Sequence, residues 1–347
     1  MKRIVAFGEL MLRLKSPGRE RLFQSPALEA SFGGGEANVA VSLSILGMSS
    51  AFVGALSSDP VGDAALRSLR AHGVDVSRVR RRPERTGIYF LEAGADQRAS
   101  QVVYDRAGSA AAAMKAGDFD WPSIMAGADW FHVTGITPAL SRSAADAAIE
   151  AAAAARAAGA KVSLDLNFRK KLWNYGAKAP EVMGRLAALA DVLVANEEDL
   201  QLGLGIAAEG APGAVDPAAG RVGAEAYRAL AESARARFPN LGIVAVTLRE
   251  SRSADRNGWS AILLGHSGFR ASRSWELEDI VDRVGGGDAF AAGLIFGLLE
   301  YGDEARALEF AVAASALKHS IPGDYNLSTR GEVERLAAGD GSGRVSR

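Results

Sequence analysis

Short apolar runs alternate with amphipathic or alanine-rich segments along most of this 347-residue chain. An apolar run that ends at glycine or at a polar residue predicts a buried strand, and apolar residues at helical spacing predict a helix. The predicted strands cover 4–7, 50–55, 129–133, 161–166, 192–195, 242–248 and 261–265, and the predicted helices cover 37–46, 61–71, 144–158, 180–190, 224–238 and most of 289–319. This alternation predicts an α/β fold with a mostly parallel central sheet and helices on both of its faces.

The alternation is interrupted in the first third of the chain. Residues 86–92 and 101–106 are rich in β-forming residues and flank a polar turn at 94–97, which predicts a hairpin. Residues 10–14 are predicted to form a further strand. We therefore expect a small β lobe made of about 10–33 and 78–107, inserted in the α/β core. Residues 205–220 are expected to form a surface insertion, and 339–347 a frayed tail.

Composition narrows the range of partners. The 40 Lys and Arg residues balance the 41 Asp and Glu residues, which argues against nucleic acid or an anionic membrane as the main partner. The basic run at 78–85 is interpreted as a solvated edge strand. The absence of cysteine excludes disulfides, thiolate zinc sites and a cysteine nucleophile. Early charges do not fit a signal peptide, and no apolar window reaches membrane-spanning length, so we expect a soluble cytoplasmic protein.

Three consecutive glycines, Gly285, Gly286 and Gly287, directly precede an apolar helical pattern. Glycines let backbone N–H groups approach a ligand, and a helix that begins there adds unpaired donors and a positive dipole end. This combination predicts an anion site, most simply for phosphate. Asp288 would repel that anion, unless it accepts a proton from a hydroxyl that attacks the phosphate. Alternatively, Asp288 is an ordinary N-terminal cap, and the stretch alone leaves both interpretations open.

Other polar residues follow predicted strands, where ligands of parallel sheets bind. A second glycine run, which includes Gly34 and Gly35, opens a helix that carries Asn38. Arg106 and Arg169 suit a carboxylate or phosphate, although each could instead belong to an ordinary charged surface. The acidic stretch after Asn196 could act through Mg²⁺ or simply favour a helix N-terminus.

Two motifs together resemble the signatures of the ribokinase-like (PfkB-type) carbohydrate kinases. They are GGGEANVAVSLSILG at 33–47 and DRVGGGDAFAAGLIFG at 282–297. Segments such as GELMLRL, VVYDRAGSA, SLDLNFRKKLW and LKHSIPGD are similar to the 2-keto-3-deoxygluconate kinase subfamily. The resemblance implies one ribokinase-like kinase domain over 1–347, with a small β-sheet lid. It also implies transfer of phosphate from ATP, with Mg²⁺, to the terminal hydroxyl of 2-keto-3-deoxygluconate.

The resemblance implies a role for individual residues. Asp288 would be the general base, and the N–H groups of Gly285, Gly286 and Gly287 would form the anion hole. The sugar acid would be bound by Gly34, Gly35, Asn38, Tyr89, Tyr104, Arg106, Arg169 and Asp324, and the nucleotide by Asn167, Asn196, Thr247, Arg249 and Ser251. Asp282 would help to hold a monovalent cation such as K⁺.

Three positions depart from the family pattern. Asp199 replaces the usual Glu, Arg283 replaces the Thr beside the catalytic loop, and the nucleotide loop near 247–260 lacks the common glycine-rich form. The alternatives are a kinase for another sugar acid or sugar, such as 2-keto-3-deoxygalactonate or fructose, and a non-catalytic sugar-acid sensor. Exposed strand edges of the lid would favour a homo-oligomer, most simply a dimer through the lid.

Overall fold

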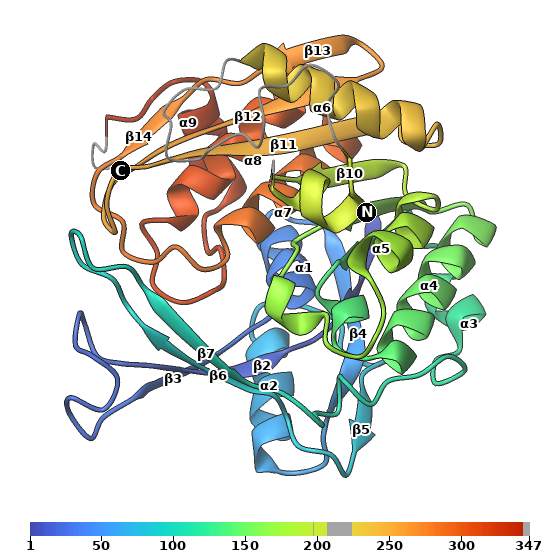
Figure 1. Cartoon of the computed structure of the whole chain (residues 1–347), viewed down its shortest axis with the longest axis vertical. Coiled ribbons are helices and arrows are strands. Elements are labelled where there is room, and N and C mark those ends of the chain that lie inside the picture. The colour runs from blue at the N-terminus through green and yellow to red at the C-terminus, as the bar shows by residue number, and fades with distance from the viewer. Residues whose placement is uncertain (197, 207–223, 343–347) are drawn as a thin grey trace.

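A computed structural model describes residues 1–196, 198–206 and 224–342, and the central sheet is its main feature (Figure 1). In this part of the chain the sheet has ten strands, in the order β13-β12-β11-β10-β9-β8-β1-β4-β5, with β14 also paired to β12. The strands from β11 through β5 pair in parallel, and the pairings of β12 are antiparallel. Their bounds are Arg3–Gly8 (β1), Ser49–Ser57 (β4), Arg80–Arg82 (β5), Trp130–Thr134 (β8), Lys161–Asp165 (β9), Val192–Ala195 (β10), Ile243–Ser251 (β11), Asn257–Gly265 (β12), Gly268–Ala271 (β13) and Trp275–Leu277 (β14).

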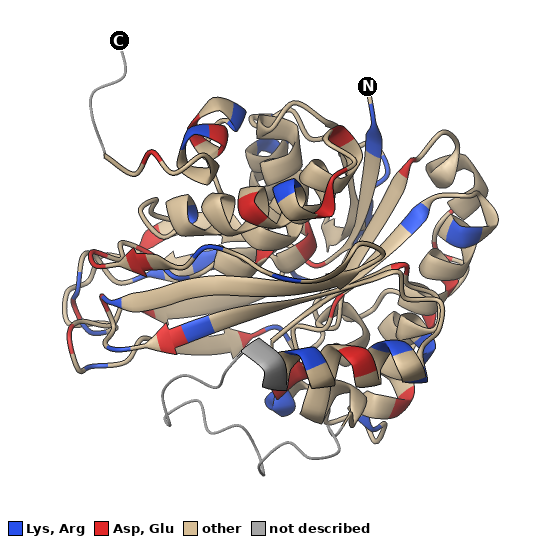
Figure 2. Ribbon diagram, turned by 90° about the horizontal axis from the view of Figure 1, so that it is seen from above, with Lys and Arg blue, Asp and Glu red and all other residues tan. Residues whose placement is uncertain are grey.

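Helices cover both faces of this sheet, as the alternation predicted. One apolar cluster joins α3, α4, α5 and α6 to one face, and two further clusters join α1, α2, α7, α8 and α9 to the other. The helices are Gly35–Ile45 (α1), Pro60–Arg70 (α2), Trp121–Met125 (α3), Arg142–Ala157 (α4), Ala179–Ala187 (α5), Ala224–Arg237 (α6), Gly286–Glu300 (α7), Glu304–Lys318 (α8) and Arg330–Ala337 (α9). Figure 2 shows charged residues mainly along the outer helices and loops, whereas the central strands are largely uncharged. Within the described ranges, every helix is too short or too polar to cross a lipid bilayer.

Sequence patterns explain where several core elements begin. Ser141 precedes α4 and its side chain accepts a hydrogen bond from the N–H of Ala144, so the alanine-rich helix has an N-terminal cap. Its small side chains allow α4 to pack closely against β8 and β9. The long antiparallel pair β11 and β12 was not predicted as such, because two apolar runs do not reveal the direction in which they pair. The short strands β13 and β14 and the helix α9 were missed as well.

A second, four-stranded sheet forms the lid, in the order β3-β2-β6-β7. It contains Met11–Lys15 (β2), Glu29–Gly33 (β3), Ile88–Glu92 (β6) and Gln101–Asp105 (β7). The antiparallel pairing of β6 with β7 confirms the predicted hairpin. The edge strands are β3 and β7, and Val103 of β7 is 52% exposed. A dimer through these edges remains a prediction, which light scattering of the purified protein would measure.

The basic run at 80–82 corrects the predicted extent of the lid. It is an edge strand, as interpreted from its charges, but β5 pairs in parallel with β4 and therefore extends the central sheet. Its arginines bind acceptors on the α/β core. Arg81 donates to Asp63 at 2.6 Å and to the carbonyl of Ser57 at 2.8 Å, and Arg82 pairs with Asp118. The predicted insertion at 205–220 and the predicted frayed tail lie mostly outside the described residues.

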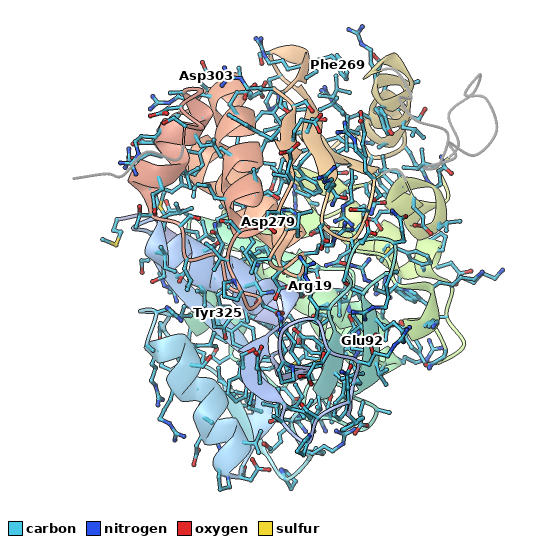
Figure 3. The ribbon with its side chains drawn as sticks, turned by 90° about the vertical axis from the view of Figure 1, so that its left-hand side faces the viewer. Arg19, Glu92, Phe269, Asp279, Asp303 and Tyr325 are labelled. Atoms are coloured by element: carbon cyan, nitrogen blue, oxygen red, sulfur yellow. The ribbon has the colours of Figure 1, made fainter. Side chains whose placement is uncertain are left out.

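The tip of the lid hairpin rests on the loop between β11 and β12. The N–H of Ala254 donates to the carbonyl of Asp96 at 2.7 Å, and the N–H of Asp96 donates to the Asp255 carboxylate at 3.0 Å. Arg19, in the loop between β2 and β3, lies 3.5 Å from the same carboxylate. Figure 3 shows Arg19 and Glu92 on this side of the molecule, below the C-terminal helices. The lid therefore spans the carboxyl edge of the central sheet and contacts the core at its far end.

Candidate active site

A cavity of about 430 Å³ lies between the lid and the carboxyl edge of the central sheet. Nearly all of the residues predicted from the sequence line it. These are Gly34, Gly35, Asn38, Tyr89, Tyr104, Arg106, Asn167, Arg169, Asn196, Thr247, Arg249, Asp282, Gly285, Gly286, Gly287, Asp288 and Asp324. Ser251 does not, since it is exposed at the end of β11 and away from the described lining. The long β11–β12 hairpin carries Ser251 beyond the cavity, so a role in nucleotide binding remains only a prediction for that residue.

The catalytic loop requires glycine at its first position. Gly285 is the N-cap of α7 and has a φ of 85°, in the left-handed region. A Cβ atom there would lie 2.0 Å from the carbonyl oxygen of Asp324, so any side chain would displace the loop. The N–H groups of this helix start have no side-chain cap. The loop therefore has the geometry expected of an anion site.

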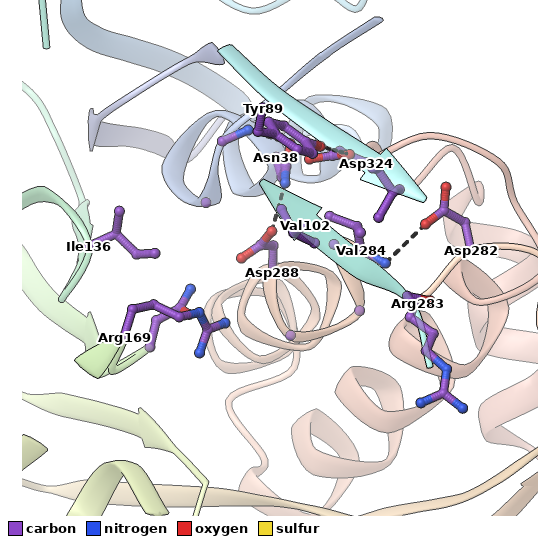
Figure 4. Close-up of a pocket in the computed structure, with 18 of the residues that line it drawn as sticks. Asn38, Tyr89, Val102, Ile136, Arg169, Asp282, Arg283, Val284, Asp288 and Asp324 are labelled. Atoms are coloured by element: carbon purple, nitrogen blue, oxygen red, sulfur yellow. Dashed lines mark hydrogen bonds between the residues drawn. The ribbon is translucent and has the colours of Figure 1, made fainter. Parts of the chain in front are cut away.

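Asp288 lies in the first turn of α7 but does not cap it. Its carboxylate accepts a hydrogen bond from the Asn38 amide at 2.7 Å, and Asn38 in turn accepts one from the N–H of Gly34 at 3.2 Å (Figure 4). Burial raises the pKa of Asp288 to about 6, although the hydrogen bond from Asn38 opposes part of that rise. An oriented carboxylate with a raised pKa, beside an anion site, suits a general base better than a cap.

This pKa predicts how activity should depend on pH. Below about 6 the Asp288 carboxyl is protonated and cannot accept a proton, so kcat/KM should rise through that pH and level off above it. Initial rates at saturating nucleotide, measured from pH 5 to 8, would check this. Burial also raises the pKa of Asp199 to about 6, which makes Asp199→Asn the necessary control. If kcat/KM of that variant no longer falls at acidic pH, the pH dependence is caused by Asp199 and not by Asp288.

Arg106 is buried at the end of β7, and its guanidinium is only partly paired. One Nη donates to Glu9 at 2.7 Å, and the guanidinium lies 4.2 Å from the centre of the Tyr104 ring. The neighbouring Asp105 pairs with Arg85 instead, so the surface alternative considered for Arg106 does not apply. Within the described residues, Nε and the second Nη of Arg106 are buried without a hydrogen-bond partner. Two unpartnered donors on a cation are expected to bind an anionic group in the cavity.

Arg169 lies across the cavity from the lid. Figure 4 shows its side chain on the same side as Ile136 and facing Asp288. It donates to the carbonyl of Phe168 at 3.0 Å, and no ion pair of Arg169 occurs within the described ranges. Its charge nevertheless acts on Asp288, where burial raises the pKa of the carboxyl and Arg169 opposes part of that rise. Arg169 can therefore bind an anionic substrate or offset charge near the reacting atoms.

Asp324 and Asp282 belong to a buried cluster that the sequence did not predict. Arg13 of β2 donates to Asp324 at 2.6 Å and also pairs with Asp282. The Tyr89 hydroxyl donates to Asp324 at 2.6 Å. Asp282 accepts further hydrogen bonds from the N–H groups of Val284 and Gly323, each at 3.1 Å. The predicted sugar-binding Asp324 thus holds the lid to the catalytic loop.

Residues that suit a nucleotide line the other end of the cavity. Arg249 is packed against Trp259, and its burial beside other cations lowers its pKa to about 10. Thr247 and Asn167 line the same cavity, and Asn167 has a φ of 34°, which asparagine tolerates better than most residues. Among the described residues the charged groups that act on Arg249 are the cations Arg283 and Arg169, and a buried guanidinium in such a setting favours a phosphate. The residue types at this end of the cavity suit a nucleotide.

The residues present fit Mg²⁺ only as a partner of phosphate groups. In the described part of the chain, no group of three or more His, Cys, Asp or Glu side chains could hold a metal ion. Asp165 and Asp199 both line the cavity, and burial together with their mutual repulsion raises the pKa of Asp165 well above its usual range. A divalent cation beside them would relieve that repulsion. Mg²⁺ usually binds in this way in kinases, through one or two carboxylates plus phosphates and water.

Arg283, which replaces the family's Thr, extends away from Asp288 (Figure 4). Its guanidinium donates to the carbonyl of Ala254 at 2.9 Å and to the Asn257 side chain at 3.0 Å. Both acceptors lie at the turn between β11 and β12. Arg283 therefore braces the loop on which the lid tip rests, and it also lines the edge of the cavity.

Sequence reasoning missed Glu9, Arg13, Asp165 and Lys318, all of which lie in or beside the site. Two of them carried a usable signal. Glu9 directly follows a buried strand, and Arg13 stands within an apolar strand pattern, where a lone charge needs a buried partner. The partners themselves could not be read from the sequence, because they lie 269 and 311 residues away from Arg13.

Comparisons with known proteins agree with this geometry. The family model described as pfkB family carbohydrate kinase matches residues 1–222 and 260–330. A 2-dehydro-3-deoxygalactonokinase from Haloferax volcanii is 32% identical over 98% of this chain and 98% of its own length. A 2-dehydro-3-deoxygluconokinase from Bacillus subtilis is 30% identical over 96% of this chain and 94% of its own. The crystal structure of 2-dehydro-3-deoxygluconokinase from Thermotoga maritima is 44% identical, covers 98% of this chain and 100% of its own, and has a TM-score of 0.90.

Proposed function

We propose, because the chain belongs to the pfkB family of carbohydrate kinases, that it is an ATP-dependent kinase of 2-keto-3-deoxygluconate. The product would be 2-keto-3-deoxy-6-phosphogluconate. The observation that carries this proposal is Arg106, a buried cation in the same cavity as Asp288, two of whose donors lack a partner in the part of the chain that the structure describes. A neutral sugar offers nothing to match such a cation, whereas a sugar acid offers a carboxylate. The names of the relatives from Bacillus subtilis and Thermotoga maritima support the same substrate.

The reaction follows from the two ends of the cavity. The carboxylate of the sugar acid binds Arg106 at the lid, with Arg169 as a second cation, which directs the terminal hydroxyl toward Asp288. Asp288 accepts the hydroxyl proton while the oxygen attacks the γ-phosphorus and the bond to the β-phosphate oxygen breaks, which releases ADP. The N–H groups of Gly285, Gly286 and Gly287 stabilise the charge on the transferred phosphoryl group. Mg²⁺, when bound with the nucleotide beside Asp165 and Asp199, would neutralise phosphate charge.

The lid supports transfer to the sugar rather than to water. Its strands contribute Tyr89 and Arg106 to the cavity, and its tip is bonded to the loop at Ala254. A closed lid excludes water from the γ-phosphoryl group, which limits hydrolysis of ATP. Substrate binding and closure are thus coupled through the same segment.

The main alternative is another acceptor, in particular 2-keto-3-deoxygalactonate, because the Haloferax volcanii relative is named for it. The two sugar acids share the carboxylate and the terminal hydroxyl and differ at C4. Arg106, Arg169 and Asp288 address only the shared groups. A kinase that accepts both epimers is therefore consistent with these residues.

A coupled ADP-release assay over a panel of acceptors tests the proposal. The panel holds both C4 epimers of the 2-keto-3-deoxy acid, gluconate, fructose and ribose, with ATP and Mg²⁺. We expect the highest kcat/KM with a 2-keto-3-deoxy sugar acid. A preference for fructose or ribose would refute the role of Arg106. Calorimetric binding of the sugar acid without any ADP release would indicate a sensor instead of an enzyme.

A further inference from the structure

The cation site implied by family resemblance does not fit this chain. Such a site would use Asp282, but both of its carboxylate oxygens already accept hydrogen bonds from protein donors. One of those oxygens also pairs with Arg13, whose side chain is 1% exposed. A K⁺ ion at Asp282 would lie next to a buried guanidinium and would be repelled by it.

A second buried cation lies on the other side of the catalytic loop. Lys318, the last residue of α8, is 0% exposed, and its ammonium donates to the carbonyl of Ile321 at 3.0 Å. Its Cε lies 3.2 Å from the position that a Cβ atom would take at Gly285. Burial lowers the pKa of Lys318, and the carboxylates of Asp282 and Asp324 oppose that shift. The ammonium is thus bound by a backbone carbonyl, its side chain lies beside the first glycine of the anion hole, and nearby carboxylates act on its charge.

The charges of the four buried side chains in this cluster balance one another. Arg13 and Lys318 carry two positive charges, and Asp282 and Asp324 carry two negative charges, so the buried cluster is neutral as it stands. An added monovalent cation would leave one unpaired positive charge in a buried place, which is costly. An ammonium group and a K⁺ ion are similar in charge and in their preference for carbonyl oxygens.

We propose that Lys318, with Arg13, permanently replaces the monovalent cation beside the anion hole, so that this enzyme needs neither K⁺ nor Na⁺. Both are positioning residues: they hold the 282–287 loop in place and bring positive charge close to the anion hole. The inference rests on the proposed kinase activity for its kinetic test only, because the cluster also contributes to the stability of the free protein.

The first test uses the unaltered protein. Its kinase rate and its melting temperature are measured in KCl, NaCl and choline chloride at one ionic strength, with choline as a cation too large for the site. We expect rates that agree within about twofold, and melting temperatures that agree as well, since no cation binds the folded state specifically. A rate or melting temperature clearly higher in KCl than in choline would overturn the proposal.

The second test removes the built-in cation. Lys318→Ala leaves the carboxylates short of one charge and opens a space, so the melting temperature in choline should fall by about 5 °C or more. KCl should then restore stability in a concentration-dependent manner, without substrate present. Lys161→Ala, in which an exposed lysine of β9 is removed, is the matched control and should show no response to K⁺.

The outcomes separate this inference from the proposed function. A response to K⁺ that appears in Lys318→Ala but not in the unaltered protein supports the replacement, whatever substrate is used. Equal melting of Lys318→Ala in KCl and choline refutes it. If the variant does not fold, the rates and melting temperatures of the unaltered protein still decide the question. A failure of the acceptor panel would refute the proposed substrate without affecting the melting results.

Discussion

Asp288→Asn is expected to lower turnover by roughly 10²–10⁴-fold, the usual contribution of a general base. The asparagine amide can still accept the hydrogen bond from Asn38, so the loop and the fold should be retained. It cannot accept a proton from the attacking hydroxyl. Steady-state kinetics, together with calorimetric titration of nucleotide and sugar acid, would show a loss in kcat with binding largely preserved.

The matched control for this variant is Asp279→Asn, in an exposed acid of the segment that precedes the same loop. It should leave kcat unchanged, because Asp279 is absent from the described cavity lining. Turnover of Asp288→Asn close to that of the unaltered protein would remove Asp288 from the chemistry. An equal loss in both variants would instead indicate damage to the segment as a whole.

Arg106→Gln is expected to lower kcat/KM for the sugar acid by about 10–10²-fold, mainly through KM, since hydrogen bonds to charged groups contribute about 1.5–3 kcal/mol each. The reason is the loss of the two donors of Arg106 that have no hydrogen-bond partner among the described residues. KM for ATP should change little, because Arg106 lies on the lid and the residues that suit a nucleotide lie on the core. Initial rates over a matrix of both substrate concentrations would measure the two constants separately.

This variant also leaves Glu9 without its partner, which could disturb the lid for a reason unrelated to substrate. The double variant Arg106→Gln with Glu9→Gln removes that charge and should keep the high KM. Arg85→Gln, in which a half-buried arginine paired with Asp105 is changed, should behave like the unaltered protein. A KM restored to normal in the double variant would show that Glu9, and not a lost substrate contact, caused the defect.

Local patterns were enough to predict the core and most of the site. The core strands and helices were expected at nearly their observed places, because buried strands and helix starts have short-range signals. Asp288 and the glycines before it were identified for the same reason. The structure shows where they lie at the start of α7, and their catalytic roles remain predictions. The lid hairpin was likewise visible in the alternation of β6 and β7.

Contacts between distant segments could not be predicted in this way. Arg13 meets its two carboxylates only because the lid folds over the loops at 282 and 324. The basic strand β5 was placed in the lid because it precedes the hairpin in sequence, although its hydrogen bonds join it to β4. Ser251 lies two residues beyond Arg249, which does line the cavity, yet the length of β11 takes Ser251 past the edge. In each case the missing information was how segments far apart in the sequence are placed relative to one another.

The hydrogen bonds between Asp96 and the loop at Ala254 join the two ends of the cavity. That loop continues β11, which carries Thr247 and Arg249 at the nucleotide end, whereas Asp96 belongs to the hairpin that covers the sugar end. For the sugar phosphate to leave, the hairpin tip has to separate from a segment whose position depends on the nucleotide end. Opening of the hairpin over the sugar end therefore breaks bonds to the segment that carries the nucleotide-end residues, which couples the two ends of the cavity.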